Sequence, residues 1–161
     1  MPLIFGYGSL INKKSISNSI PGERELYPTR IYGYKRGWYA SDNNVTWLGI
    51  KKRSGYTVNG VIFFVTDEEM SILDKRESIY KRLKVKSYSV LSDKYPFDKN
   101  NIIYTYIFEG KRNDSPIFST YINMCLEGTI EQDRIMGFGY PKFTREFLET
   151  TYSWPKNNWV P

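Results

Sequence analysis

The sequence contains no histidine, and its only cysteine is Cys125. Without histidine, the chain cannot build histidine-containing zinc sites or the Ser-His and Cys-His pairs of many hydrolases. A single cysteine cannot form an intramolecular disulfide, and its neighbours Met124 and Leu126 indicate a buried thiol on a helix rather than a nucleophile. The sequence therefore predicts neither a metal site nor a cofactor. It leaves few side chains other than carboxylates that could act as a base at neutral pH.

Long apolar runs are absent as well. No stretch of about 18 apolar residues is present, and residues 1–5 have neither the basic start nor the long apolar core of a signal peptide. These absences predict a cytoplasmic protein that does not enter a membrane. The 161 residues are 40% hydrophobic and 17% aromatic, which favours a packed core. Because no repeat, low-complexity tract or linker divides them, we expect one domain over residues 1–161.

The net charge of +6 would suit an acidic partner, so the placement of the charges matters. The basic residues stand in small groups between apolar runs, at Lys13-Lys14, Lys35-Arg36, Lys51-Lys52-Arg53, Lys81-Arg82 and Lys111-Arg112. This scatter is typical of a solvated surface rather than a track for nucleic acid. One alternative stays open, a binder of single-stranded nucleic acid that stacks bases on some of the 14 Tyr, 9 Phe and 4 Trp.

The hydrophobic pattern predicts an α+β fold with a mixed, strongly curved, barrel-like sheet and a few flanking helices. The predicted strands cover residues 2–5, 30–39, 46–52, 58–65, 85–91 and 101–108. The predicted helices or helical turns cover 12–19, 66–77 and 118–131, and a last helix, capped by Thr144, should end near Trp154. Turns are predicted at 54–56, as a hairpin, and at 94–98.

The loop that follows the first strand reads Gly6-Tyr7-Gly8-Ser9-Leu10. Two glycines permit left-handed and other backbone conformations closed to most residues, so such a loop can turn its N–H groups toward a bound anion. It lacks the Lys-Ser/Thr of a P-loop and the third glycine of a dinucleotide fingerprint, so nucleotide binding is poorly supported. Ser9 has no histidine or evident lysine partner, which argues against a serine nucleophile. A tight turn without a binding role is the plain alternative.

A capping-box pattern, with Thr66 as N-cap and Glu69 three residues later, predicts a helix that runs to about Glu77. Met70 and Leu73 should form its buried stripe, while Asp74 and Glu77, three residues apart, share a face near its end. Taken alone, Glu77 would be read as a solvated ion-pair member, because basic residues surround it.

Together, the two segments resemble the gamma-glutamylcyclotransferase superfamily, including its ChaC-like and AIG2-like branches. Tyr7-Gly8-Ser9-Leu10 matches the loop that follows the family's first strand, and Leu73-Asp74-Lys75-Arg76-Glu77 matches the family's Leu-Asp-x-x-Glu helix end. The segment from Tyr80 to Val85 is similar to the family's Tyr-x-Arg-x-x-Val approach to the next strand. Ser119-Thr120-Tyr121 resembles a segment whose tyrosine lines the substrate pocket in relatives.

The resemblance implies a cofactor-independent enzyme that cyclises a γ-glutamyl small molecule to 5-oxoproline, with Glu77 as general acid and base. It also implies a substrate-binding set made of Tyr7, Gly8, Ser9, Leu10, Tyr80 and Tyr121. The chain departs from the ChaC-like pattern after the last strand, which bears on the use of glutathione. A catalytically silent, ligand-binding member of the same fold is the second hypothesis, because a fold does not guarantee an activity.

Overall fold

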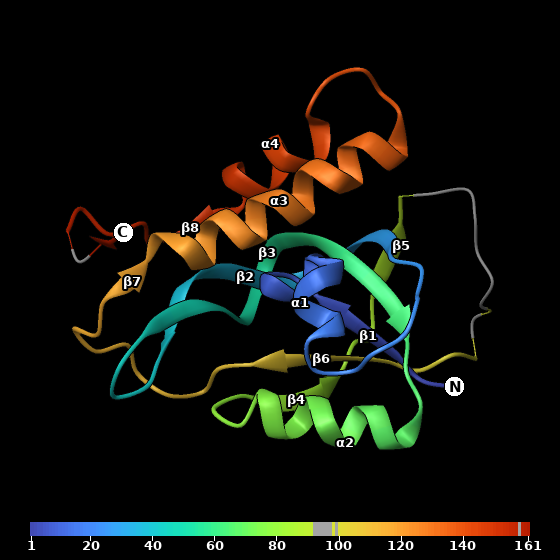
Figure 1. Cartoon of the computed structure of the whole chain (residues 1–161), viewed down its shortest axis with the longest axis horizontal. Helices are drawn as coiled ribbons and strands as arrows, with labels where there is room; N and C mark the ends of the chain where they lie inside the picture. The colour runs from blue at the N-terminus through green and yellow to red at the C-terminus, as the bar shows by residue number, and fades with distance from the viewer. Residues whose placement is uncertain (92–97, 99, 158) are drawn as a thin grey trace.

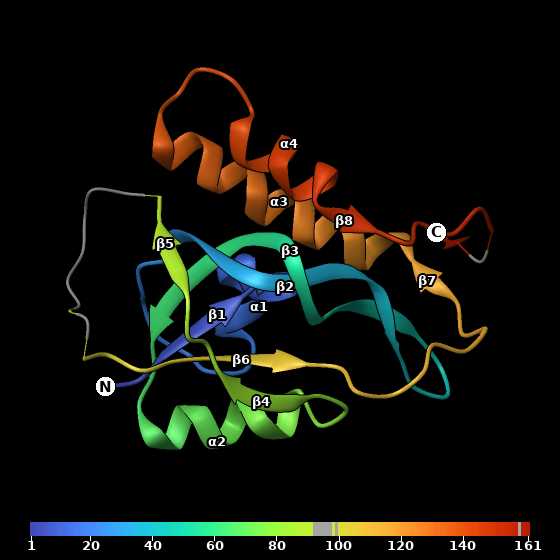
Figure 2. The same cartoon turned by 180° about the vertical axis from the view of Figure 1, so that it is seen from behind.

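The computed structural model describes residues 1–91, 98, 100–157 and 159–161. In this part of the chain, one mixed sheet has the strand order β4 (Lys81–Lys84), β6 (Ile103–Ile107), β1 (Leu3–Gly6), β3 (Thr46–Phe64), β2 (Tyr27–Ser41) and β5 (Tyr88–Val90). The short β8 (Thr151–Tyr152) is also paired to β2. Helices α3 (Ser119–Met136) and α4 (Lys142–Glu149) lie together on one side of the sheet, and α2 (Asp67–Arg76) lies on the other (Figures 1 and 2). The predicted α+β fold with a mixed sheet is confirmed. The sheet is open, between edges β4 and β5, so it does not close into a barrel.

Strand β1 (Leu3–Gly6) lies in the middle of the sheet, and all four of its residues are buried. It runs antiparallel to β3 (Thr46–Phe64) and parallel to β6 (Ile103–Ile107). A strand enclosed on both faces reads as a continuous apolar run, which explains why the sequence predicted it well. The glycine loop therefore leaves the sheet from its most rigid position.

Strands β2 (Tyr27–Ser41) and β3 form one long antiparallel hairpin. The predicted hairpin turn at 54–56 is wrong, because β3 continues through it and the real turn lies between Ser41 and Thr46. Gly55 has φ +85° and Gly33 has φ +83°, and the pairing register shifts between Tyr32 and Tyr34. The glycines therefore bend two continuous strands at an irregularity instead of reversing the chain.

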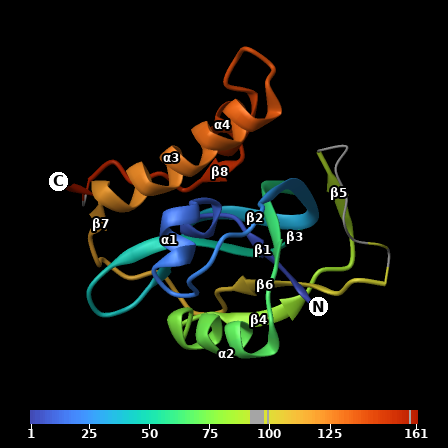
Figure 3. The same cartoon turned by 45° about the vertical axis from the view of Figure 1, so that its right-hand side comes forward.

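The chain crosses from one edge of the sheet to the other after the first half of the molecule (Figure 3). Strand β4 (Lys81–Lys84) pairs with β6, whereas β5 (Tyr88–Val90) pairs with β2. The single strand predicted over 85–91 is therefore shorter, and β4 was missed because its residues are mostly exposed and charged. The turn predicted at 94–98 lies outside the described residues, except for Asp98.

Helix α2 (Asp67–Arg76) has the predicted capping box, in which Thr66 and Glu69 exchange hydrogen bonds. Met70 and Leu73 are buried, as predicted, and anchor the helix on the sheet. Glu77 is the C-cap residue, one position beyond the last helical residue. Burial of the apolar stripe thus fixes where the end of α2, and with it Glu77, meets the sheet.

The other helices enclose the glycine loop. The loop continues into the 3₁₀ turn η1 (Ser9–Ile11) and α1 (Lys13–Ser17). Helix α3 (Ser119–Met136) follows β7 (Ile117–Phe118), which pairs with β9 (Trp159–Val160). A Cβ at Gly128 would lie 2.8 Å from the Ile11 carbonyl carbon, so α3 packs on the loop backbone.

Helix α4 (Lys142–Glu149) differs from the prediction at both ends. Pro141 is its N-cap residue, and Thr144 lies inside the helix, where its hydroxyl group donates to Asp133 at 2.6 Å. The helix ends at Glu149 instead of near Trp154 because Thr151 already pairs with β2. Tertiary contacts therefore override the capping signal of the sequence.

Candidate active site

A cavity of about 460 Å³ opens beside the glycine loop and the end of α2. All seven site residues predicted from the sequence line it: Tyr7, Gly8, Ser9, Leu10, Glu77, Tyr80 and Tyr121. The other residues that line it come from β1, α1, the hairpin, the α2 end, β6 and α3: Phe5, Ser15, Asp42, Trp47, Leu48, Arg76, Ser78, Ile79, Tyr106 and Met124. Segments far apart in the sequence thus meet around one space.

The Glu77 side chain is 15% exposed, and burial raises the pKa of its carboxyl group, while the nearby Arg76 cation partly opposes the shift. Its Oε1 lies 3.3 Å from the Arg76 Nε, but no described residue donates a hydrogen bond to this carboxylate. A carboxylate without donors that lies in a cavity and has a raised pKa is suited to accept a proton from a ligand.

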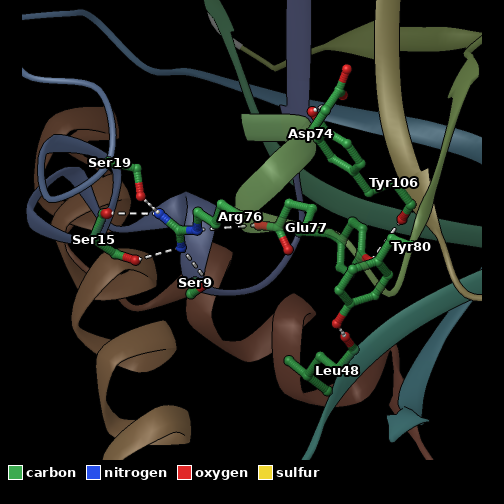
Figure 4. A network of polar contacts seen from close by, with 10 residues as sticks. Ser9, Ser15, Ser19, Leu48, Asp74, Arg76, Glu77, Tyr80 and Tyr106 are labelled. Carbon is green, nitrogen blue, oxygen red and sulfur yellow. Dashed lines mark hydrogen bonds and ion pairs between the residues drawn. The ribbon is translucent and has the colours of Figure 1, made fainter. Parts of the chain in front are cut away.

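Arg76 ties the end of α2 to the loop and α1 (Figure 4). Its Nη1 donates to the Ser15 carbonyl oxygen at 2.8 Å and to the Ser19 Oγ at 3.1 Å, and its Nη2 donates to the Ser9 Oγ at 3.0 Å and the Ser15 Oγ at 2.8 Å. In the sequence, Arg76 is only a neighbour of Glu77. The structure makes it the residue that sets the distance between Glu77 and the loop.

Close packing around the loop explains why Gly6 and Gly8 are glycines. Neither Gly6 nor Gly8 has a positive φ, so neither adopts the left-handed conformation that a glycine permits. A Cβ on Gly6 would lie 2.6 Å from the Leu10 Cβ, and a Cβ on Gly8 would lie 2.9 Å from the Tyr121 Oη. The glycines are required by close approach, which lets Tyr121 reach the loop.

The loop backbone keeps free donors. Ile11 N–H donates to the Gly8 carbonyl at 3.0 Å, and Asn12 N–H donates to the Ser9 carbonyl at 3.1 Å. Within the described residues, no acceptor binds the N–H groups of Gly8, Ser9 or Leu10. These three residues line the cavity, so they offer hydrogen-bond donors to a ligand.

Tyrosines build much of the remaining wall. The Tyr7 hydroxyl donates to the Tyr106 carbonyl at 2.7 Å, and the Tyr80 hydroxyl donates to the Leu48 carbonyl at 2.7 Å. Burial is the main cause that raises the pKa of Tyr7, Tyr80 and Tyr121 well above the usual value for tyrosine, so these hydroxyls remain protonated. They shape the cavity wall, which also contains the carboxylates of Glu77 and Asp42.

Asp74, three residues before Glu77, lies next to the site and not in its wall. Its Oδ1 accepts from the Tyr106 hydroxyl at 2.8 Å, its Oδ2 accepts from Arg82 at 2.6 Å, and it is not part of the cavity wall. Because Tyr106 does line the cavity, this hydrogen bond connects Asp74 to the cavity wall (Figure 4).

Two further buried side chains lie close to the site, and one of them was not expected to be buried. Arg36 was expected on the surface with Lys35 but is fully buried, and its Nη1 donates to the Tyr7 carbonyl at 3.1 Å. Cys125 is buried as predicted, and burial raises the pKa of its thiol to about 12. A thiol of this kind is not a nucleophile at neutral pH.

The described part of the chain also lacks the side-chain groups of a metal site and the helices of a membrane span. It contains no group of three or more Cys, Asp or Glu side chains placed to hold a metal ion. None of its helices is long and apolar enough to cross a membrane.

A family model described as "Gamma-glutamyl cyclotransferase, AIG2-like" matches residues 4–121. The match spans the glycine loop, α2 with Glu77, and the start of α3 at Tyr121. The chain belongs to this family. Membership agrees with the resemblance seen in the sequence, and the matched segment contains the loop, Glu77 and Tyr121.

Solved structures share the whole fold. A gamma-glutamyl cyclotransferase superposes with a TM-score of 0.70 and 15% identity, over 99% of this chain and 93% of that chain. An uncharacterised protein from Homo sapiens superposes with a TM-score of 0.67 and 16% identity, over 96% of this chain and 91% of that chain. A yeast gamma-glutamyl cyclotransferase specific to glutathione superposes with a TM-score of 0.51 and 14% identity, over 92% of this chain and 94% of that chain. The TM-scores show a common fold. A comparison with curated proteins finds no match.

Proposed function

We propose that this family member is an enzyme that cyclises a γ-glutamyl group to 5-oxoproline and releases an amine or amino acid. The main support is the Glu77 carboxylate, which lies in the cavity and accepts no hydrogen bond from the described residues. Burial raises its pKa, and backbone N–H groups without an acceptor line the same cavity. The reaction needs these two kinds of group and no cofactor.

The chemistry is an intramolecular acyl transfer. The α-nitrogen of the γ-glutamyl group forms a bond to its own γ-carbonyl carbon, and the bond from that carbon to the leaving nitrogen breaks. Holding the chain in the reactive shape can lower the barrier by roughly 7–11 kcal/mol at best. A narrow cavity walled by Tyr7, Tyr80 and Tyr121 favours such a folded substrate.

Glu77 would move the proton. The substrate's α-amine is an ammonium group near neutral pH and cannot attack until it loses a proton. The Glu77 carboxylate takes that proton, and the resulting acid gives a proton to the leaving nitrogen, so the enzyme ends each cycle in its starting state. Burial raises the pKa of Glu77 toward neutral pH, and a group whose pKa lies nearer the operating pH is better suited both to accept and to donate a proton.

The loop would bind charge that develops on the substrate. The N–H groups of Gly8, Ser9 and Leu10 are fixed donors, which suits a substrate carboxylate or the oxyanion of the tetrahedral intermediate. The assigned substrate-binding residues are Tyr7, Gly8, Ser9, Leu10, Tyr80 and Tyr121. Glutathione is one candidate among γ-glutamyl amino acids, peptides and amines, since a relative of the same fold is specific to it.

The test is to incubate the purified chain with glutathione, a γ-glutamyl amino acid and a γ-glutamyl alkylamine, and to measure 5-oxoproline by mass spectrometry. N-acetylated forms of the same compounds are matched controls, because they lack a nucleophilic amine and should give no product. Binding of a γ-glutamyl compound without any 5-oxoproline would instead favour the silent, ligand-binding hypothesis.

The nucleic-acid alternative has less support from the surface. The Lys35 Nζ lies 4.7 Å from the ring centroid of Tyr56 and 4.6 Å from that of Tyr152, and the Lys51 Nζ lies 4.3 Å from that of Tyr39. These aromatic faces are covered by the protein's own lysines. A stacked base would have to displace a favourable cation–π contact.

A further inference from the structure

Arg36 is a buried cation behind the glycine loop. Its side chain is fully inaccessible, and none of the described carboxylates forms an ion pair with it. Its guanidinium donates only to neutral oxygens: the carbonyls of Tyr7, Asn59 and Phe147, the Asn59 Oδ1, and the hydroxyls of Thr150 and Thr151. Burying a charge without an opposite charge is unfavourable, so this position invites a functional explanation.

A clamp between strands and helix would explain most of these contacts. Thr150 and Thr151 follow α4, and Asn59 lies on β3, so Arg36 joins three elements. That purpose does not require the contact with the Tyr7 carbonyl, which belongs to the loop. This one contact connects the buried cation with the cavity.

The Tyr7 carbonyl fixes the direction of the Gly8 N–H. The described chain has no cis peptide bond, and in a planar trans peptide the C=O and the next N–H point in opposite directions. The Tyr7 carbonyl accepts from the Arg36 Nη1 at 3.1 Å on the buried side. The Gly8 N–H therefore points away from Arg36, and Gly8 lines the cavity.

The contact also strengthens the donor. A cation bonded to the carbonyl oxygen polarises the whole peptide group and makes its N–H a better hydrogen-bond donor. We propose that Arg36 is a positioning residue that locks the Tyr7–Gly8 peptide with its N–H toward the substrate and polarises it for the developing oxyanion. This inference rests on the proposed function, because it assigns the Gly8 N–H to that reaction.

The first test compares Arg36→Lys with Thr151→Val. The lysine nitrogen occupies the place of the guanidinium carbon, one bond short of Nη1, so it keeps the charge but loses the Tyr7 carbonyl. Thr151→Val removes the acceptor of the Arg36 Nε and leaves the Tyr7 contact in place. We expect Arg36→Lys to lower kcat by about 10²–10³-fold with little change in KM, as for loss of one oxyanion donor. Thr151→Val should keep kcat near the wild-type value.

Equal kcat in Arg36→Lys and wild type, or equal losses in both variants, would overturn the proposal, since the second result marks a purely structural role. The crystal structure of Arg36→Lys gives an answer that does not depend on activity. We expect the Tyr7–Gly8 peptide to be rotated or to have several orientations, and an unchanged peptide would refute the positioning role. A wild type that makes no 5-oxoproline would instead count against the proposed function, and the peptide orientation would still decide the role of Arg36.

A third measurement covers the case in which Arg36→Lys does not fold. In the wild type labelled with ¹⁵N-glycine, the Gly8 cross-peak is identified by its loss in Gly8→Ala. Because the Gly8 N–H has no acceptor and faces the cavity, it should exchange with deuterium before the first spectrum. A protected Gly8 amide would show that the N–H faces the protein interior and would contradict the proposal.

Discussion

Replacing Arg76 by glutamine should loosen the junction between α2 and the glycine loop. The substitution removes four hydrogen bonds, to Ser9, Ser15 and Ser19, and the ion pair with Glu77. Hydrogen bonds to a charged group contribute roughly 1.5–3 kcal/mol each, but they are not additive, and glutamine restores part of them. The Arg76 side chain is 21% exposed, so water replaces others. We therefore expect a loss of about 2–4 kcal/mol in the free energy of unfolding.

Thermal unfolding followed by circular dichroism measures this loss. In a chain of this size, each kcal/mol shifts Tm by about 2–4 °C, so Tm should fall by about 4–16 °C. Arg134→Gln is the matched control, because Arg134 is 72% exposed and pairs with Glu131 on the surface. Its Tm should stay close to that of the wild type. If the two variants had the same Tm, Arg76 would not hold the loop to α2, and the argument would fail.

Three further outcomes are expected. Burial raises the pKa of Glu77, so the folded protein loses stability as the pH rises from the ordinary glutamate pKa of about 4.3 through the raised value. The difference in Tm between Glu77→Gln and the wild type should therefore grow with pH in favour of the variant. A difference that stays constant with pH would contradict the shift. Gly8→Val should lower kcat/KM more than Ser9→Ala, because only the valine side chain collides with Tyr121, and the reverse order would implicate the serine side chain. EDTA should leave 5-oxoproline formation unchanged because the described residues contain no metal-binding group, and small thiol reagents should do so because the buried Cys125 thiol has a pKa of about 12. Inhibition by a chelator that a divalent ion reverses would point to a metal.

Local signals in the sequence predicted the elements that position the site. The apolar residues 2–5 predict a strand before the loop, and the capping box at Thr66 predicts the start of α2. Both depend on residues within a few positions of one another, so no tertiary information is needed. The grouping of the loop with Glu77 came from the family resemblance, and the structure places both segments at one cavity.

The remaining features depend on partners distant in sequence. Gly55 reads as a turn residue because its role in a bent strand is set by the facing β2 strand. Arg36 reads as a surface charge beside Lys35 because its acceptors stand 23 to 115 positions away along the chain. Thr144 reads as an N-cap residue because its actual partner, the Asp133 carboxylate of the preceding helix, accepts a hydrogen bond from its hydroxyl group only in the folded chain. The roles of these three residues can be assigned only once the fold shows which distant residues they contact.

The measurement that tests the central claim most directly is the rate of 5-oxoproline formation by Glu77→Gln against the wild type, with Asp74→Asn as control. The glutamine keeps the size of the side chain but cannot accept the ammonium proton, so we predict a loss of kcat of about 10²–10⁴-fold. Asp74 contacts Tyr106 and Arg82 and not the cavity, so Asp74→Asn should be much milder. A loss below about tenfold in a folded Glu77→Gln, from an active wild type, would show that Glu77 is not the base.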